Sequence, residues 1–158
     1  MMYITVNGEQ KSTQADPMTP LARVLREEFF LTGTKVACGE GFCGSCLVLL
    51  DDRPVMSCLV PIGLARDRSV RTVESLAPDD RPLSPLQQAM EEHDAVQCGM
   101  CFPGILMMLT HLFEKDDAPS EADIRAALVG NVCRCTGYAR IVEAALSVSG
   151  RPQSDNNR

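Results

Sequence analysis

The chain has 158 residues, a formal net charge of −6 and a pI near 4.9. This length allows one ordinary domain or two small ones, and the acidic balance argues against nucleic acid or an anionic membrane surface as a partner. No apolar run approaches the roughly 20 residues that span a bilayer, and residues 1–10 lack the basic and then apolar pattern of a secretory signal.

The first part of the chain predicts a hairpin and a helix. Residues 2–6 and 9–13 have the pattern of two strands, joined by the hairpin turn Asn7–Gly8. Thr19–Pro20 is expected to be an N-cap followed by proline at the first helical position. The apolar positions of the helix then recur at helical spacing as far as Phe29.

A glycine-rich cysteine segment follows. Three of its cysteines have the spacing C-x4-C-x2-C of a plant-type 2Fe–2S site, and a fourth follows after eleven intervening residues: Cys38, Cys43, Cys46 and Cys58. The interleaved Gly39, Gly41 and Gly44 are expected to take positive φ angles, because the backbone must wrap closely around four thiolates. Such a wrap also brings backbone N–H groups to the sulfurs, which tunes the potential of a cluster.

Short strands are predicted on both sides of this segment. Strands are expected over residues 47–50, 55–60 and 69–73, with a turn at 51–54. Four or five short strands with one crossing helix indicate a β-grasp ferredoxin-like domain. Residues 75–81, with their proline and aspartate residues, are typical of a linker.

Beyond the linker the apolar period changes from 2 to 3.6, which predicts helices. Four are expected: one from the capping box Ser84–Gln87 to about His93, one over 102–113, one capped by Ser120–Asp123 that ends at Gly130, and one over 137–148. The predicted fold class is therefore α+β, with a β-grasp domain over 1–76, a linker over 77–84, a four-helix domain over 85–149 and a flexible tail over 150–158.

The helical half contains four more cysteines, as one C-x2-C pair and one C-x-C pair, each just before a predicted helix: Cys98, Cys101, Cys133 and Cys135. Helix N-termini favour an anionic group, so two such ends would suit a second 2Fe–2S cluster. A structural zinc ion also suits four thiolates and stays open on spacing alone, whereas disulfides are disfavoured without a secretory signal. Two oxidised clusters would bring the net charge to about −10, which favours a partner with basic docking patches.

These motifs resemble a known family. Residues 31–35, 38–46 and 55–59 are similar to the first cluster segment, and residues 85–87, 97–104 and 130–138 to the second, of one group of proteins. The group is the small iron–sulfur subunit of the molybdenum hydroxylases, the xanthine oxidase, aldehyde oxidase and carbon monoxide dehydrogenase superfamily. The resemblance covers residues 2–148 and implies a β-grasp domain and a four-helix domain, each with one 2Fe–2S cluster.

The resemblance also implies roles for individual residues. The first cluster would be held by Cys38, Cys43, Cys46 and Cys58, and the second by Cys98, Cys101, Cys133 and Cys135. Gln97 and Cys135 would approach a molybdopterin-type cofactor in the partner, although Gln97 by itself has the pattern of a polar helix cap. The chain departs from the family where Phe102 replaces the usual Thr, Ala37 replaces Gly and Asp51–Asp52 replaces Asp-Gly. None of these departures removes a ligand.

The expected function is electron transfer without substrate chemistry on this chain. Electrons would pass from the molybdopterin site of a large partner, through the helical-domain cluster and then the β-grasp cluster, to FAD or another acceptor. A separate FAD-binding subunit is favoured, with a cytochrome acceptor as the alternative. The cytoplasm is the expected location, and export together with a signal-bearing partner stays open. A free-standing two-cluster ferredoxin and a structural zinc-binding module are the rival hypotheses.

Other notable side chains are expected to be structural. His93 and His111 are assigned no metal or catalytic role, and Met100, Met107 and Met108 are expected to fill the core. Two cations are assigned to the clusters: Lys35 would offset charge at the first, and Arg134 would offset charge at the second or face the pterin.

Overall fold

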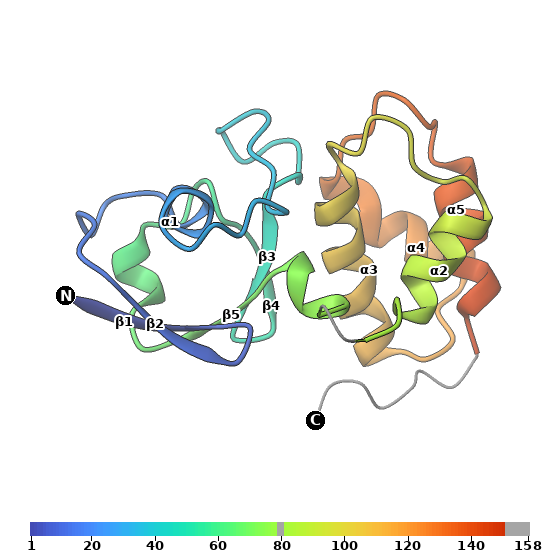
Figure 1. The fold of residues 1–158 in the computed structure, drawn as a ribbon. Helices are drawn as coiled ribbons and strands as arrows, with labels where there is room; N and C mark the ends of the chain where they lie inside the picture. Colours follow the sequence, from blue (N-terminus) through green and yellow to red (C-terminus); the bar gives the residue numbers. More distant parts are fainter. Residues whose placement is uncertain (79–80, 151–158) are drawn as a thin grey trace.

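The computed structural model describes residues 1–78 and 81–150. The five strands form one sheet, which helix α1 crosses. Figure 1 shows this sheet next to a group of helices that packs on its β3–β4 side. This arrangement confirms the α+β fold class, with a ferredoxin-like sheet domain first and a helical domain second. Among the described residues, no helix is long and apolar enough to cross a membrane.

The sheet is mixed, with strand order β2-β1-β5-β3-β4. Its strands are β1 (Met2–Val6), β2 (Glu9–Thr13), β3 (Leu47–Leu50), β4 (Arg53–Met56) and β5 (Ser69–Arg71). Strands β1 and β5 run parallel, and the other neighbours are antiparallel. The predicted hairpin is confirmed, because Asn7 and Gly8 connect β1 to β2 with φ angles of 52° and 85°.

Two strand predictions were too long. The strand expected over 55–60 pairs only as far as Met56, because Ser57 turns away and bonds the Cys46 carbonyl through both its N–H (3.3 Å) and its hydroxyl (2.6 Å). The strand expected over 69–73 ends at Arg71. There the Asn7 side chain accepts the Thr72 N–H at 2.8 Å and so replaces a strand partner. The β3–β4 turn is shorter than predicted, with only Asp51 and Asp52 outside the strands.

Helix α1 (Leu21–Glu27) crosses one face of the sheet and is shorter than its apolar stripe predicted. Its N-cap is Pro20 rather than Thr19, because Pro20 is extended and forms a bridge to Pro61. The helix ends before Phe29, whose N–H bonds back to the Val24 carbonyl at 3.1 Å. Phe29 still packs against the core of the sheet domain, so its apolar position indicated burial rather than helix.

Strand β3 is buried on both faces and joins the two domains. Val48 and Leu50 face the α1 side, in a cluster with Val24 and Leu25. Leu47 and Leu49 face the other way and pack against Met107 of the helical domain. Because side chains alternate along a strand, one short strand serves two cores.

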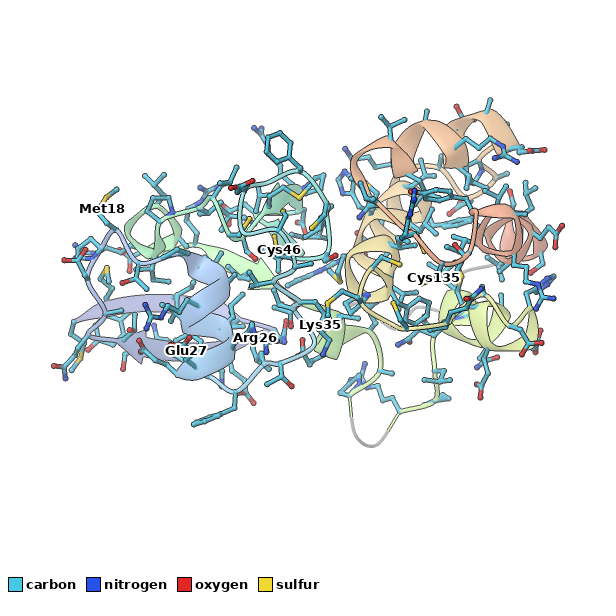
Figure 2. All side chains as sticks on the ribbon, turned by 90° about the horizontal axis from the view of Figure 1, so that it is seen from above. Met18, Arg26, Glu27, Lys35, Cys46 and Cys135 are labelled. Atoms are coloured by element: carbon cyan, nitrogen blue, oxygen red, sulfur yellow. The ribbon has the colours of Figure 1, made fainter. Side chains whose placement is uncertain are left out.

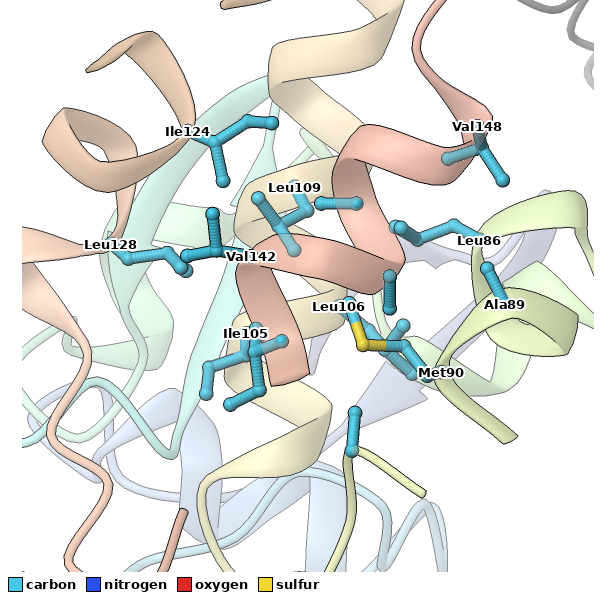
Figure 3. Packing of buried hydrophobic residues seen from close by; sticks show 14 of the residues in the cluster. Leu86, Ala89, Met90, Ile105, Leu106, Leu109, Ile124, Leu128, Val142 and Val148 are labelled. Atoms are coloured by element: carbon cyan, nitrogen blue, oxygen red, sulfur yellow. The ribbon is translucent and has the colours of Figure 1, made fainter. Parts of the chain in front are cut away.

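The helical domain contains four α-helices and short 3-10 turns. Its elements are α2 (Pro85–Glu92), α3 (Phe102–Lys115), α4 (Glu121–Ala127), η3 (Leu128–Gly130) and α5 (Ala139–Val148). Two 3-10 segments precede it along the chain, η1 (Ile62–Ala65) and η2 (Val73–Leu76). Both predicted capping boxes are present, at Ser84 with Gln87 and at Ser120 with Asp123. Figure 3 shows the core between these helices, where Leu106, Leu109 and Val142 lie buried.

Some details of the second half differ from prediction. Ser75 and Leu76 belong to η2 rather than to an unstructured linker, and Leu76 packs against the helical core. Helix α5 begins at Ala139, because Gly137 and Tyr138 both have positive φ angles. Met107 is buried as expected, but Met100 is 46% exposed and is not core. Part of the predicted linker and tail, residues 79–80 and 151–158, lies outside the described residues.

Candidate electron-transfer site: two sets of four thiols

The first four thiols come mostly from one loop between α1 and β3. Gly39, Gly41 and Gly44 of this loop have φ angles of +71°, +79° and +72°, as the sequence predicted. A Cβ at Gly44 would come within 2.4 Å of the Gly130 carbonyl oxygen, so the helical domain approaches the loop too closely for any side chain there. Cys58 lies in the turn after β4. Two hydrogen bonds, from the Ser57 N–H and hydroxyl to the Cys46 carbonyl, hold that turn against the loop.

Each of two thiols in this set interacts most strongly with one neighbouring thiol: Cys38 with Cys43, and Cys58 with Cys46. The thiols of Cys38 and Cys43 interact on the half-buried side, and those of Cys46 and Cys58 interact in the interior. The Glu40 N–H, 3.4 Å from the Cys38 sulfur, and the neighbouring Cys43 thiol lower the pKa of Cys38 to about 6. Burial and the Cys46 thiol raise the pKa of Cys58 to about 11. The loop therefore has an outer pair near solvent and an inner pair in the interior.

The second four thiols come from two segments that meet beside α3. The sulfurs of Cys98 and Cys135, both exposed, are 3.6 Å apart. Two thiolates on one tetrahedral ion with bonds of about 2.3 Å lie about 3.8 Å apart, so this pair fits a single iron. The remaining thiols, of Cys101 and Cys133, interact with each other deeper in the fold. Figure 2 shows Cys46 in the sheet domain and Cys135 in the helical domain.

Local bonds set the chemistry of the inner pair in the helical domain. Burial and the neighbouring Cys133 thiol raise the pKa of Cys101 to about 12. Burial opposes ionisation of Cys133 as well, yet the Thr136 hydroxyl, 3.0 Å from its sulfur, and nearby N–H groups lower its pKa. Cys101 is the N-cap of α3, as predicted. Cys135 does not directly precede α5, because Thr136, Gly137 and Tyr138 come between them.

The pairing of the thiols bears on which metal they would hold. Among the described residues, no three His, Cys, Asp or Glu side chains meet at a point where they could hold one metal ion. The thiols instead form two pairs in each domain. A binuclear cluster needs two thiolates at each of two irons, and the donor set fits that requirement.

The other predicted site residues have mixed outcomes. The Gln97 carboxamide donates to the Cys135 carbonyl at 3.2 Å, so it does lie at the outer pair of the second site. Arg134 is exposed beside that pair. The Lys35 ammonium donates to the Thr32 carbonyl at 2.8 Å, inside its own loop. His111 is half-buried on α3, where burial and the nearby Lys115 lower its pKa.

A groove lies next to the second site. It has a volume of about 350 Å³ and is lined by Leu83, Gln87, Met90, Glu91, Asp94, Val96 and Phe102. Its lining combines apolar side chains with the two exposed carboxylates of Glu91 and Asp94. Val96 and Phe102 also line the small hollow that contains Cys98 and Cys135. The groove is therefore continuous with the exposed outer pair of thiols.

Backbone contacts connect the two sites directly, which sequence reasoning did not anticipate. The Val132 N–H donates to the Cys43 carbonyl at 2.8 Å, and the Asn131 carboxamide donates to the Gly44 carbonyl at 3.2 Å. A Cβ at Gly104 of α3 would lie 1.9 Å from that same Gly44 oxygen. Cys43 belongs to the first set of thiols and Val132 precedes Cys133 of the second. The signal was present in the glycine at 104 and the Gly-Asn-Val run before Cys133, but spacing alone gave these residues no partner.

Comparison with known proteins identifies the family. Residues 4–71 match the 2Fe-2S iron-sulfur cluster binding domain family, and residues 72–146 match the [2Fe-2S] binding domain family. The chain is 44% identical to the nicotine 6-hydroxylase small subunit of Paenarthrobacter nicotinovorans, over 97% of this chain and 92% of that protein. The chain belongs to the small iron–sulfur subunits of the molybdenum hydroxylases.

Further relatives agree with this assignment of the iron–sulfur subunit. Caffeine dehydrogenase subunit gamma of Pseudomonas sp. (strain CBB1) is 46% identical, over 94% of this chain and 90% of that subunit. A chain of quinoline 2-oxidoreductase from Pseudomonas putida 86 superposes with a TM-score of 0.89 at 38% identity, covering 94% of this chain and 91% of that one. This subunit is therefore the electron-transfer component of an oxidoreductase complex, and its substrate is oxidised elsewhere.

Proposed function

We propose that this iron–sulfur subunit holds two 2Fe–2S clusters and carries electrons from a molybdopterin-type cofactor in a large partner subunit to FAD or another acceptor. The observation that carries the proposal is the pairing of thiols, two and two in each domain, with a backbone hydrogen bond between the two sites. When bound, each cluster would supply reversible one-electron chemistry. The pairing favours binuclear clusters over a zinc ion, which needs four thiolates around one centre.

The ligand assignment follows the observed pairs. In the sheet domain, Cys38 and Cys43 would bind the outer iron, and Cys46 and Cys58 the inner one. In the helical domain, the outer iron would be bound by Cys98 and Cys135, and the inner iron by Cys101 and Cys133. The domain limits proposed with it are 1–76 and 85–149, with 77–84 as the linker.

The backbone of this chain connects the two sites. From Cys133 the chain leads through one peptide unit to Val132, whose N–H bonds to the Cys43 carbonyl. A cysteine of one site thus reaches a cysteine of the other through covalent bonds and one hydrogen bond of 2.8 Å. No side chain has to move for this contact to form, so the protein provides a preorganised connection between the two sites.

The large partner is proposed to dock at the second site. Cys98 and Cys135 are exposed there, and Gln97 donates to the Cys135 carbonyl, which supports the proposal that Gln97 and Cys135 approach the pterin. The lining of the adjoining groove combines apolar side chains with the exposed Glu91 and Asp94. A basic and apolar segment of the molybdenum-bearing subunit would complement it in charge and polarity.

The electron acceptor is proposed to dock at the first site. Phe42 is 75% exposed beside the outer pair, and the exposed Leu59 touches the same loop at Gly41. Large apolar side chains around a partly exposed site are typical of a protein interface. A separate FAD-binding subunit is the proposed occupant, and a cytochrome is the alternative. Because all eight cysteines are free thiols, the proposed location is the cytoplasm, where thiols stay reduced.

Purification of the tagged chain from its native host, with metal analysis of the intact complex, tests the proposal. We expect about four iron atoms per chain, as two such clusters require, together with molybdenum and a larger subunit. Iron without molybdenum or a partner would instead indicate a free two-cluster ferredoxin, and zinc in place of iron would overturn the redox function. Substrate assays should begin with nitrogen heterocycles, because the relatives named above act on nicotine, caffeine and quinoline.

A further inference from the structure

Tyr138 lies at the centre of the loop that connects the two thiol sites. Its hydroxyl accepts the Cys133 N–H at 2.8 Å and donates to the Asn131 carbonyl at 2.9 Å. Its own N–H donates to the Thr136 hydroxyl, which in turn contacts the Cys133 sulfur. One side chain therefore bonds the residue before Val132 and the residue after it.

Val132 is the residue that this arrangement holds in place. Its side chain is 54% exposed, so packing of that side chain does little to fix its backbone. Its N–H nevertheless meets the Cys43 carbonyl of the other domain at 2.8 Å. The hydrogen bonds from the Tyr138 hydroxyl to Asn131 and Cys133 fix the backbone on either side of Val132. They therefore orient the Val132 N–H toward the Cys43 carbonyl.

Two features set Tyr138 apart from an ordinary loop residue. Its backbone has φ of +69°, a region that bulky residues rarely occupy and that persists only where the surroundings enforce it. Its ring packs partly against the core of the helical domain, which anchors the hydroxyl. Strain of this kind is maintained where it places a group that is needed.

Asn131 provides a second hold on the same contact. It is 1% exposed, and its carboxamide donates to the Gly44 carbonyl next to Cys43. Its side-chain oxygen is buried without a partner among the described residues. A buried amide that satisfies only its donor is costly, so this residue is optimised for the contact across the domain boundary rather than for stability.

We propose that Tyr138 is a positioning residue that holds the Val132 N–H on the Cys43 carbonyl and thereby sets the rate of electron transfer between the two clusters. Asn131 supports it from the other side of Val132. The inference rests on the proposed function, since it needs both clusters in place. It goes further in assigning a role to a tyrosine that supplies no ligand to either set of thiols.

The test compares two tyrosine variants of the intact complex. Tyr138→Phe removes only the bridging hydroxyl, and Tyr3→Phe makes the same change at the only other tyrosine, whose side chain is exposed on β1. One-electron photoreduction followed by rapid freezing and EPR measures how fast the electron redistributes between the two clusters. We expect Tyr138→Phe to slow redistribution severalfold, because the coupling between the clusters weakens when the Val132 N–H is no longer held on the Cys43 carbonyl, and Tyr3→Phe to leave it unchanged.

A second pair of variants tests the connection itself. Val132→Pro removes the bridging N–H, and Val132→Ala keeps it. Asn131, the residue before it, has φ of −114° and ψ of 111°, which a following proline tolerates. We expect Val132→Pro to slow redistribution at least as much as Tyr138→Phe, and Val132→Ala to match the natural chain. Midpoint potentials are measured for each variant, so that a change in driving force is not taken for a change in coupling.

The outcomes separate this inference from the proposed function. A complex without two cluster signals overturns the proposed function. Two intact signals with an unchanged rate in Tyr138→Phe overturn the role of Tyr138, and an unchanged rate in Val132→Pro overturns the role of the bond. Loss of iron from the second site in Tyr138→Phe also overturns the inference, because Tyr138 would then build the site rather than position the connection.

Discussion

The two thiol sites contain the same donors but are built in different ways. The first takes three of its four cysteines from one loop of nine residues, 38–46, and needs only the Cys58 turn to complete it. The second takes two pairs that are separated by 31 residues, and they meet only when the helices pack. The first site therefore depends on local backbone conformation, and the second depends on a helical core.

The two sites also share one design. Each has an outer pair of thiols on the solvent side and an inner pair in the interior. The outer pairs are suited to exchange electrons with partners, while the carbonyl of Cys43 receives the direct contact from the other domain. The two sites therefore differ in which segments bring the cysteines together, but they agree in having one outer and one inner pair of thiols.

Removal of one inner thiol should break one site and spare the other. We expect Cys46→Ser to lose the first cluster and Cys133→Ser the second, each leaving about two of four iron atoms. The reason is that each set of thiols lies within its own domain. Iron analysis and cluster-resolved EPR measure the result. Equal loss of both signals in either variant would show that the sites do not form independently.

A cavity made in the core of one domain should weaken the cluster site of that domain and spare the other site. Leu109→Ala and Leu25→Ala each empty a fully buried position, in the helical and sheet domains respectively. Each should cost about 2–5 kcal/mol. We expect Leu109→Ala to speed loss of the second cluster on heating and Leu25→Ala to affect the first, followed by EPR. The same order of cluster loss in both variants would contradict separate support.

Thiol reactivity should separate the outer pair from the inner pair in the cluster-free chain. Cys38, with a pKa of about 6, is mostly thiolate at pH 7, whereas Cys58 and Cys101, at about 11 and 12, are protonated. After allowing for the weaker nucleophilicity of a low-pKa thiolate, we expect Cys38 to react about a hundredfold faster with iodoacetamide.

The rate at which Cys38 itself is alkylated should fall as the pH drops below about 6, because its thiolate then binds a proton. Alkylation of each peptide, followed by mass spectrometry between pH 5 and 8, measures this dependence. Labelling of all three thiols at one rate would contradict the division into outer and inner pairs.

A methyl group added where α3 meets the cysteine loop should have the smallest effect of these changes. A Cβ at Gly104 would lie 1.9 Å from the Gly44 oxygen, whereas one at Gly130 would meet only the Met56 methyl at 3.7 Å. We expect Gly104→Ala to destabilise the chain by about 1–3 kcal/mol, the usual cost of overpacking, and Gly130→Ala to cost less. Thermal unfolding of both variants measures the difference. Equal stability would mean that the boundary can open without cost.

Local signals predicted most of the elements. The hairpin at Asn7–Gly8, the capping boxes at Ser84 and Ser120 and the positive φ angles in the cysteine loop are all confirmed, because each depends on bonds between residues a few positions apart. The end of α1 and the length of the strand after Pro54 were wrong. In both places the apolar pattern continued past the regular hydrogen bonds, because the Phe29 N–H bonds back to Val24 and Ser57 bonds to Cys46.

The sequence by itself predicted which residues would carry the chemistry, because cysteine spacing and glycine placement are local requirements of an iron–sulfur site. Only the tertiary structure decided how the thiols pair, that β3 serves two cores, and that Val132 meets Cys43. The Asn131 bond to Gly44 joins residues 87 positions apart. Contacts of that range form when whole domains pack, so no local pattern specifies them.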